Sequence, residues 1–212
     1  AAWIKRVQCM KFWRRVYRKL HARTVEAVAT GIGLVRKTAG LYCSDDAVKR
    51  SGAQDVRNAA VMQSVYAVNE QGQAYALAEL AAKGTANQEI RRVELLPRIA
   101  GSELIAKDCG HMAVMVTVTC PSRFHAATTR KDGRVVDNPK WAGLTAREGQ
   151  DYLAKQWARC RAAAARMGLE WYGFRIAEPQ HDGTPHWHCL LFFPHGAEGV
   201  DSLVLLQALV RK

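Results

Sequence analysis

The sequence contains no stretch of about 18 uncharged apolar residues, the length that a helix needs to cross a bilayer. Its N-terminus is basic but lacks the compact apolar run and the small-residue cleavage site of a signal peptide. Gly31 and Gly33 belong to no GxGxxG string. We therefore expect no membrane-spanning segment, no secretory signal and no dinucleotide-binding loop.

The cysteines form no CxxC pair, which argues against a zinc ribbon. The fragment Cys109-Gly-His111 could supply two zinc ligands, but no second Cys/His pair at zinc spacing accompanies it. We therefore expect reduced thiols in an intracellular protein. The cysteines are Cys9, Cys43, Cys109, Cys120, Cys160 and Cys189.

Charge of one sign is in excess. The 31 lysines and arginines outnumber 19 acidic residues and give a formal net charge of +12. Such a balance favours a polyanionic partner, most simply nucleic acid, although charge that only keeps the protein in solution is the alternative. With 212 residues and 49% hydrophobic content, the chain can form one large domain or two small ones around a buried core.

Residues 1–25 hold eight basic residues and no acidic one. Apolar residues recur there at steps of three and four, which predicts an amphipathic helix. Its basic face could lie along a phosphate backbone, a solvated face is the equally simple alternative, and a membrane-surface helix is a weaker third. The DNA-contact candidates on this helix are Arg14, Arg15 and Arg18.

Residues 26–107 keep helical spacing, broken at several glycines, and complete a basic, helical N-terminal region over residues 1–107. The breaks are expected at Gly31 to Gly33, Gly40, Ser51-Gly52, Gly72 and Gly84. Leu77 to Lys83 is a strong helix former, and Asn87 is the expected N-cap of the next helix.

Residues 108–212 form a second predicted domain. Residues 112–119 are β-branched and mostly apolar, which predicts a strand, and a turn-rich basic loop follows. A helix capped by Thr145 extends through Met167, and strands 171–178 and 184–193 flank a hairpin turn at 179–183. Asp201 is expected to cap a final helix. This order predicts the α+β class.

His186 and His188 are two residues apart on one predicted strand, so their imidazoles project from the same face while Trp187 points the other way. Glu178 is expected across the hairpin, within reach of both. Two imidazoles and a carboxylate can hold Mn²⁺, Mg²⁺ or Zn²⁺ and leave positions open for a phosphate. A chance His-x-His pair is the alternative. His181 and His195 are expected to face solvent.

The string from Tyr172 to Phe192 (YGFRIAEPQHDGTPHWHCLLF) resembles the second motif of the HUH endonucleases, and most closely that of the bacteriophage replication gene A protein family. The string from Val116 to His125 (VTVTCPSRFH) looks like the first motif of that family. Weaker similarities extend the resemblance over nearly the whole chain, at Tyr42 to Asp45, Asn69 to Gly72, Leu77 to Leu80 and Ile90 to Arg92.

The resemblance implies an antiparallel sheet with flanking helices and a metal on the sheet face, Mg²⁺ or Mn²⁺ being favoured. A tyrosine then attacks a phosphate of single-stranded origin DNA, and the free 3′-OH primes rolling-circle replication. The implied metal ligands are His186, His188 and Glu178, and Arg123 and Arg134 join the candidates for phosphate contacts. A host replication helicase is the implied partner, in the cytoplasm of a bacterial host, with no membrane involved.

The chain departs from the family pattern in two places. The nucleophilic tyrosines of the family lie downstream of the HUH string, yet the last tyrosine here is Tyr172. We therefore expect no catalytic nucleophile in this chain, a domain incomplete at its C-terminus and a fragment that does not cleave alone. Tyr152 is a poor substitute, because a tyrosine in mid-helix beside Trp157 favours packing. Gln180 stands where the family pattern leads us to expect histidine.

Two further readings stay open. A module that keeps the HUH fold could bind DNA without cleaving it, and a basic α+β protein could lack the metal altogether.

Overall fold

The computed structural model describes residues 2–194 and confirms the α+β class. The helices are α1 (Ala2–Val7), α2 (Met10–Gly31), α3 (Asp45–Ser64), α4 (Leu77–Lys83), α5 (Gln88–Asp108), the short 3₁₀ helix η1 (Ser122–Phe124) and α6 (Ala146–Arg166). The strands are β1 (Tyr66–Val68), β2 (Ala74–Ala76), β3 (His111–Thr119), β4 (Ala127–Thr129), β5 (Val135–Asp137), β6 (Tyr172–Pro179) and β7 (Pro185–Pro194). Among the described residues, no helix has the length and apolarity to cross a membrane.

The described chain divides into two compact units. Unit 1 comprises residues 2–49, 119–152 and 179–186, and unit 2 comprises 50–118, 153–178 and 187–194. The division passes through α6 and β7, which are nevertheless continuous elements. The predicted boundary between two sequence domains at residue 107 does not coincide with this division and stays a prediction.

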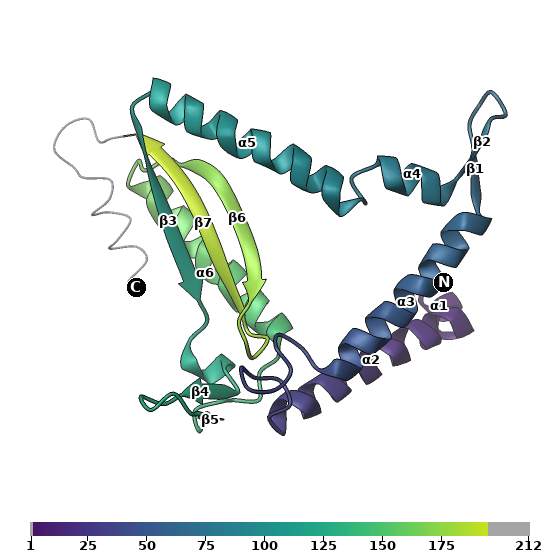
Figure 1. Ribbon diagram of the computed structural model, residues 1–212, viewed down its shortest axis with the longest axis horizontal. Coiled ribbons are helices and arrows are strands. Elements are labelled where there is room, and N and C mark those ends of the chain that lie inside the picture. Colours follow the sequence, from purple (N-terminus) through teal and green to yellow (C-terminus); the bar gives the residue numbers. More distant parts are fainter. Residues whose placement is uncertain (1, 195–212) are drawn as a thin grey trace. The chain divides into compact units, whose positions relative to one another are not determined.

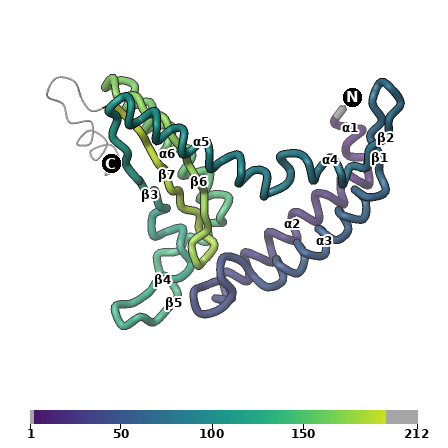
Figure 2. Tube along the Cα trace, turned by 45° about the horizontal axis from the view of Figure 1, so that its top comes forward, coloured from purple at the N-terminus to yellow at the C-terminus, as the bar shows by residue number. Residues whose placement is uncertain are grey.

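In unit 1, the predicted N-terminal amphipathic helix is present, with a break after Val7 that separates α1 from the long α2 (Figure 2). The carboxylate of Glu26 on α2 accepts hydrogen bonds from the backbone N–H of Ser44 at 2.8 Å and from its hydroxyl at 2.5 Å. This pair of hydrogen bonds fixes the loop that follows α2. The basic segment expected to be a loop contains a small antiparallel hairpin, in which Thr128 pairs with Val136.

In unit 2, α4 and α5 confirm two predictions, since α4 spans Leu77–Lys83 and the Asn87 side chain accepts a hydrogen bond from the Glu89 N–H at 3.0 Å. The break expected at Ser51-Gly52 was wrong, because α3 continues through it. A single glycine costs a helix only about 1 kcal/mol relative to alanine, which the rest of α3 tolerates.

The antiparallel hairpin β1–β2 lies around Gly72, where a break between helices was expected but no strand. Its turn is organised by one side chain: Oδ1 of Asn69 accepts from the N–H of Gln71 at 3.1 Å and from that of Gln73 at 2.9 Å. Asparagine favours such turns because its side chain mimics a backbone carbonyl.

The sheet that carries the candidate site has the strand order β3-β7-β6, with β7 in the centre and antiparallel to both neighbours (Figure 1). The predicted strands 112–119, 171–178 and 184–193 are confirmed as β3, β6 and β7, and α6 covers one face of the sheet. Gly173 lets β6 approach β7, since a Cβ there would collide with the Leu190 carbonyl oxygen.

The predicted cap of α6 is confirmed. The hydroxyl and the N–H of Thr145 both donate to the Glu148 carboxylate, at 2.7 and 2.8 Å. Both hydrogen bonds lower the pKa of Glu148, and the bond from the backbone N–H has the larger effect. The helix expected after Asp201 lies outside the described residues.

Candidate metal centre

The turn between β6 and β7 brings the candidate ligands together. The N–H of Gln180 donates to the Thr184 carbonyl at 2.8 Å, and the N–H of Gly183 donates to the Gln180 carbonyl at 2.8 Å. Oδ1 of Asp182 accepts from the N–H of Thr184 at 3.0 Å. The turn is therefore tight, as the sequence predicted, and it places Glu178 on β6 opposite the histidines of β7.

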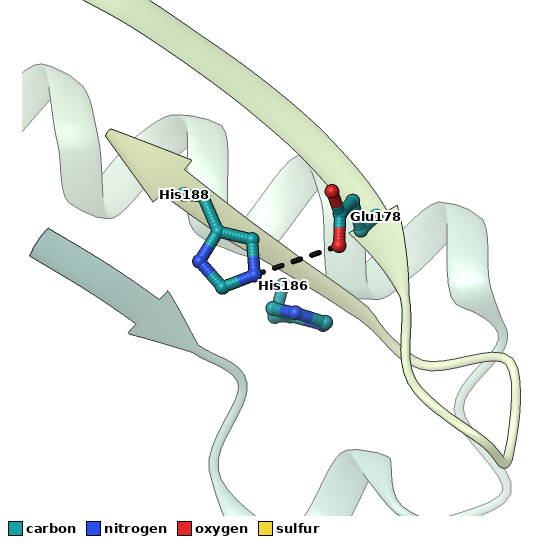
Figure 3. Close-up of side chains that lie close together, drawn as sticks. All are labelled: Glu178, His186 and His188. Carbon is teal, nitrogen blue, oxygen red and sulfur yellow. Dashed lines mark ion pairs between the residues drawn. The ribbon is translucent and has the colours of Figure 1, made fainter. Parts of the chain in front are cut away.

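Glu178, His186 and His188 each offer one ligand atom, and these atoms all lie within 4.8 Å of one another. Nε2 of His188 is 3.5 Å from Oε2 of Glu178, and Figure 3 shows both imidazoles and the carboxylate gathered at one place on the hairpin. Both histidines are partly exposed and the glutamate is exposed, so solvent reaches the cluster. The structure therefore brings all three predicted ligands together.

The orientation of His188 is set by a neighbouring strand. Oγ1 of Thr117 on β3 lies 3.1 Å from Nδ1 of His188. A hydroxyl that accepts the Nδ1 proton leaves the Nε2 lone pair available on the side of Glu178. Partners of this kind fix the tautomer and ring orientation of metal-binding histidines.

The opposite face of β7 is packed into the core. Trp187 is fully buried, and its ring centroid lies 6.4 Å from that of Trp157 on α6, nearly edge to face. Cys189 and Leu191 are also buried, so burial alternates from Pro185 to Leu191, as a period of two requires. The guanidinium of Arg175 on β6 stacks over the Trp187 ring at 4.0 Å. This packing fixes the register that presents the two imidazoles.

The donor set fits a divalent cation. Two imidazole nitrogens and a carboxylate oxygen suit Zn²⁺ or Mn²⁺, and with added water and phosphate oxygens also Mg²⁺. Three protein ligands leave coordination positions open to a substrate. The Cys109-Gly-His111 fragment belongs to no comparable cluster within residues 2–194.

A partly buried ion pair lies at the same hairpin turn. Nδ1 of His125 is 2.9 Å from Oδ2 of Asp182, and Nε2 of His125 is 3.2 Å from the Cys120 carbonyl oxygen. Both partners are acceptors, so the ring satisfies both only as an imidazolium. The hydrogen bond to Asp182 raises the pKa of His125. Burial raises the pKa of Asp182, but its hydrogen bonds with His125 and Thr184 outweigh burial and lower it.

Tyr152 is a packing residue in this structure. Its ring lies 5.0 Å from that of Phe124, and the Arg123 guanidinium lies 5.4 Å from its centroid. These contacts are those expected of a tyrosine in mid-helix. Arg123 itself is exposed at the surface of unit 1.

The other candidates for phosphate contacts lie on elements other than the β6–β7 hairpin. Arg14, Arg15 and Arg18 are exposed on α2, and Arg134 is exposed beyond β4, where its Nε lies 3.6 Å from Asp132. Their contact with DNA stays a prediction. His181 is exposed as predicted, while His195 lies outside the described residues.

Sequence reasoning missed Thr117, His125 and Asp182. All three belong to strings that resemble the family motifs, but their roles depend on contacts between segments more than 50 residues apart in sequence. Only the resemblance of the Val116 to His125 string could have drawn attention to Thr117 and His125.

The cysteines are all free, as predicted. Burial raises the pKa of Cys120 to about 11, so this thiol stays protonated and unreactive.

Comparison with known proteins identifies relatives of one kind. The chain is 38% identical over 189 residues to a probable replication endonuclease from a prophage-like region of Salmonella paratyphi A, covering 89% of this chain and 23% of the relative. It is 36% identical over 194 residues to the replication gene A protein of Escherichia phage 186, covering 91% of this chain and 27% of that protein. It is 34% identical over 206 residues to the replication protein of Haemophilus phage HP1, covering 95% of this chain and 25% of that protein.

The chain thus spans about a quarter of the length of the curated relatives that it matches. No solved structure matches it. The family model described as bacteriophage replication gene A protein matches residues 1–207, which is nearly the entire chain. This protein therefore belongs to the bacteriophage replication gene A protein family.

Proposed function

We propose that this chain supplies the metal-binding half of a site that nicks single-stranded DNA at a replication origin. The observation that carries the proposal is the cluster of Glu178, His186 and His188, whose ligand atoms lie within 4.8 Å of one another on an accessible sheet face. The name of the Salmonella relative, a probable replication endonuclease, supports the same class of reaction.

The three side chains would hold a divalent cation, Mg²⁺ or Mn²⁺, which as a Lewis acid would polarise a phosphate oxygen. Thr117 contributes by holding His188 in the orientation that turns Nε2 toward Glu178. Trp187 contributes by anchoring the strand between the two histidines in the core. These contacts keep the ligand set in place before DNA arrives, and preorganisation of this kind lowers the cost of catalysis.

The attacking group is proposed to be a tyrosine outside these residues. Its hydroxyl would lose its proton and its oxygen would form a bond to the scissile phosphorus while the bond to the 3′ oxygen breaks. The 3′ oxygen would take up a proton, leaving a 5′-phosphotyrosine and a free 3′-OH that primes rolling-circle replication. Tyr152 is not assigned this part, since its ring packs against Phe124 and under Arg123.

The net charge of +12 supports single-stranded DNA as the partner, because phosphates attract a basic protein. The exposed Arg14, Arg15, Arg18, Arg123 and Arg134 are the proposed phosphate contacts. A host replication helicase is proposed as the protein partner, and the bacterial cytoplasm as the location.

Metal binding is tested by titrating the 212-residue chain with Mn²⁺ and following free Mn²⁺ by electron paramagnetic resonance. We expect one bound ion, lost in His186→Ala and His188→Ala and weakened in Glu178→Gln. His181→Ala is the matched control, because this exposed histidine lies in the same hairpin outside the cluster. Equal Mn²⁺ binding by His188→Ala and the control would refute the metal centre.

The position of the nucleophile is tested by incubating the chain with single-stranded DNA and Mn²⁺ and resolving covalent adducts by denaturing electrophoresis. We expect DNA binding that Mn²⁺ strengthens, without a covalent adduct. An adduct that survives Tyr152→Phe would place another nucleophile in the chain, and one that disappears with this variant would assign Tyr152. A protein of the family that contains this segment and its natural continuation should form the adduct, and failure there would favour a module that binds DNA without cleaving it.

A further inference from the structure

A pocket in unit 1 has no part in the metal centre. It is a cavity of about 310 Å³ whose lining includes Arg36, Lys37, Asn138, Gln180, His181 and Asp182. This volume is at the lower end of the range for small-ligand sites, about 300 to 1,000 Å³, and suits a group the size of one nucleotide. Three separate segments of unit 1 contribute to it: the loop after α2, the region from η1 to the strand β5, and the β6–β7 turn.

The wall of the pocket is rigid. The amide nitrogen of Asn138 donates to the Ser122 carbonyl at 2.7 Å and to the His125 carbonyl at 2.8 Å. The ion pair between His125 and Asp182 ties this wall to the β6–β7 turn. The polar groups of Asn138, His125 and Asp182 are therefore committed to holding the pocket together.

Other polar groups in the lining are available to a ligand. Within residues 2–194, Nε of Arg36 is buried without a hydrogen-bond partner, and the guanidinium pairs only loosely with the exposed Asp137, at 3.6 Å. No hydrogen bond involves the side chains of Lys37 or Gln180 in that described part of the chain. Because the Asp182 carboxylate is paired with His125, the uncompensated charge at the pocket is positive.

The turn also presents an aromatic platform. The His181 ring stacks on that of Tyr42, with centroids 6.0 Å apart and planes 25° from parallel, and both side chains are exposed. The N–H of Tyr42 donates to the His181 carbonyl at 3.2 Å. Gly183 makes this approach possible, since it has a φ of +79° and a Cβ there would lie 2.8 Å from the Tyr42 carbonyl oxygen.

We propose that this pocket binds one nucleotide of single-stranded DNA and reads its base. The base stacks on His181 and meets the Gln180 amide, while Arg36 and Lys37 hold the adjoining phosphate. Stacking on an aromatic face combined with a basic groove is the usual way of holding single-stranded nucleic acid, and an amide at the base edge adds selectivity.

This inference rests on the proposed function, which makes single-stranded DNA the ligand of the pocket. Gln180 follows Glu178 by two residues, a span of at most about 7 Å along the chain. The nucleotide read by the pocket is therefore a near neighbour of the phosphate assigned to the metal centre. In this way a site that recognises only a phosphate gains a preference for one sequence.

The test is the affinity of the 212-residue chain for fluorescent dA, dC and dT homopolymers of equal length, measured by anisotropy in EDTA so that metal has no influence. We expect one homopolymer to be preferred, and Gln180→Ala or His181→Ala to remove that preference and weaken its binding about tenfold, as the loss of one stacked base does. Lys37→Ala should weaken all three homopolymers alike and reduce the slope of log affinity against log salt by about one.

The matched controls are His21→Ala, an exposed histidine on α2, and Lys131→Ala, an exposed lysine on the β4–β5 turn outside the pocket lining. Each variant is first shown to retain the wild-type circular dichroism spectrum and melting temperature. Homopolymers bound equally by the wild type, or a preference kept by Gln180→Ala and His181→Ala, would overturn the pocket. The Mn²⁺ titration is independent of this result, so the two proposals can fail separately.

Discussion

Oγ1 of Thr117 and Nδ1 of His188 lie 3.1 Å apart and join β3 to β7. The contact connects the string from Val116 to His125 with the string that contains the histidines. With Nδ1 of His188 beside this hydroxyl, Nε2 is the ring nitrogen that faces Glu178, at 3.5 Å from Oε2.

Replacing Thr117 with valine removes the hydroxyl and keeps the side-chain shape. We expect Mn²⁺ affinity to fall about tenfold or more, as for other partners that orient metal ligands, with little change in the melting temperature. Thr117→Ser should restore the affinity because it returns the hydroxyl. Calorimetric titration of the three proteins checks this, and unchanged affinity in Thr117→Val would remove Thr117 from the site.

The ion pair between His125 and Asp182 predicts a pH-dependent stability. The raised pKa of His125 gives stability that is fully present below its usual 6.5 and is lost as the pH rises through the folded-state pKa. The lowered pKa of Asp182 gives stability that is present above its usual 3.8 and is lost as the pH falls through the folded-state pKa. The pair therefore contributes most between these two values.

Asp182→Asn tests this window. We expect it to lower the free energy of unfolding by about 1 to 3 kcal/mol near pH 5.5, because the partly buried imidazolium loses its anionic partner. The difference from the wild type should shrink above the raised pKa of His125. Urea unfolding over a series of pH values measures it, and a loss independent of pH would mean that the pair is not ionised.

Trp187 links the core to the ligands. Trp187→Ala removes a fully buried side chain and should lower the free energy of unfolding by about 3 to 5 kcal/mol. His188→Ala, on the half-exposed face of the same strand, should change it by less than about 1 kcal/mol. Urea unfolding of both variants compares the two faces, and similar losses would contradict the assignment of one face to the core.

Replacing Gly183 with alanine is expected to strain the β6–β7 turn. In Gly183→Ala the new Cβ meets the Tyr42 carbonyl oxygen at 2.8 Å, and the φ of +79° is unfavourable for alanine. We expect a loss of about 1 kcal/mol or more in stability. Gly133→Ala is the control, since that glycine has a similar φ of +83° but open space around it. Thermal unfolding of the two variants isolates the contact with Tyr42.

The regular parts of the fold were predictable because they obey local rules. The strand β7 was predicted after a tight turn, and Thr145 was predicted as the cap of α6, where its hydroxyl donates to Glu148. The grouping of Glu178 with the histidines followed from hairpin geometry alone. These signals lie within a few residues of one another or across a single tight turn.

Other features depend on contacts that spacing does not encode. The β1–β2 hairpin has only three residues in each strand, too few for an alternating pattern to stand out. Gly52 looked like a break because glycine is a poor helix former, but the residues around it decide the outcome. The pairing of His125 with Asp182 joins residues 57 apart in sequence and became visible only in the fold.

The alternation along β7 has a consequence for folding. A slip of one residue in the pairing of this strand would expose Trp187 and bury His186 and His188 in apolar surroundings. Misregistered chains are thus penalised twice, through lost core packing and through buried imidazoles. Packing of the hydrophobic core therefore selects the one strand register that presents both histidines on the accessible face.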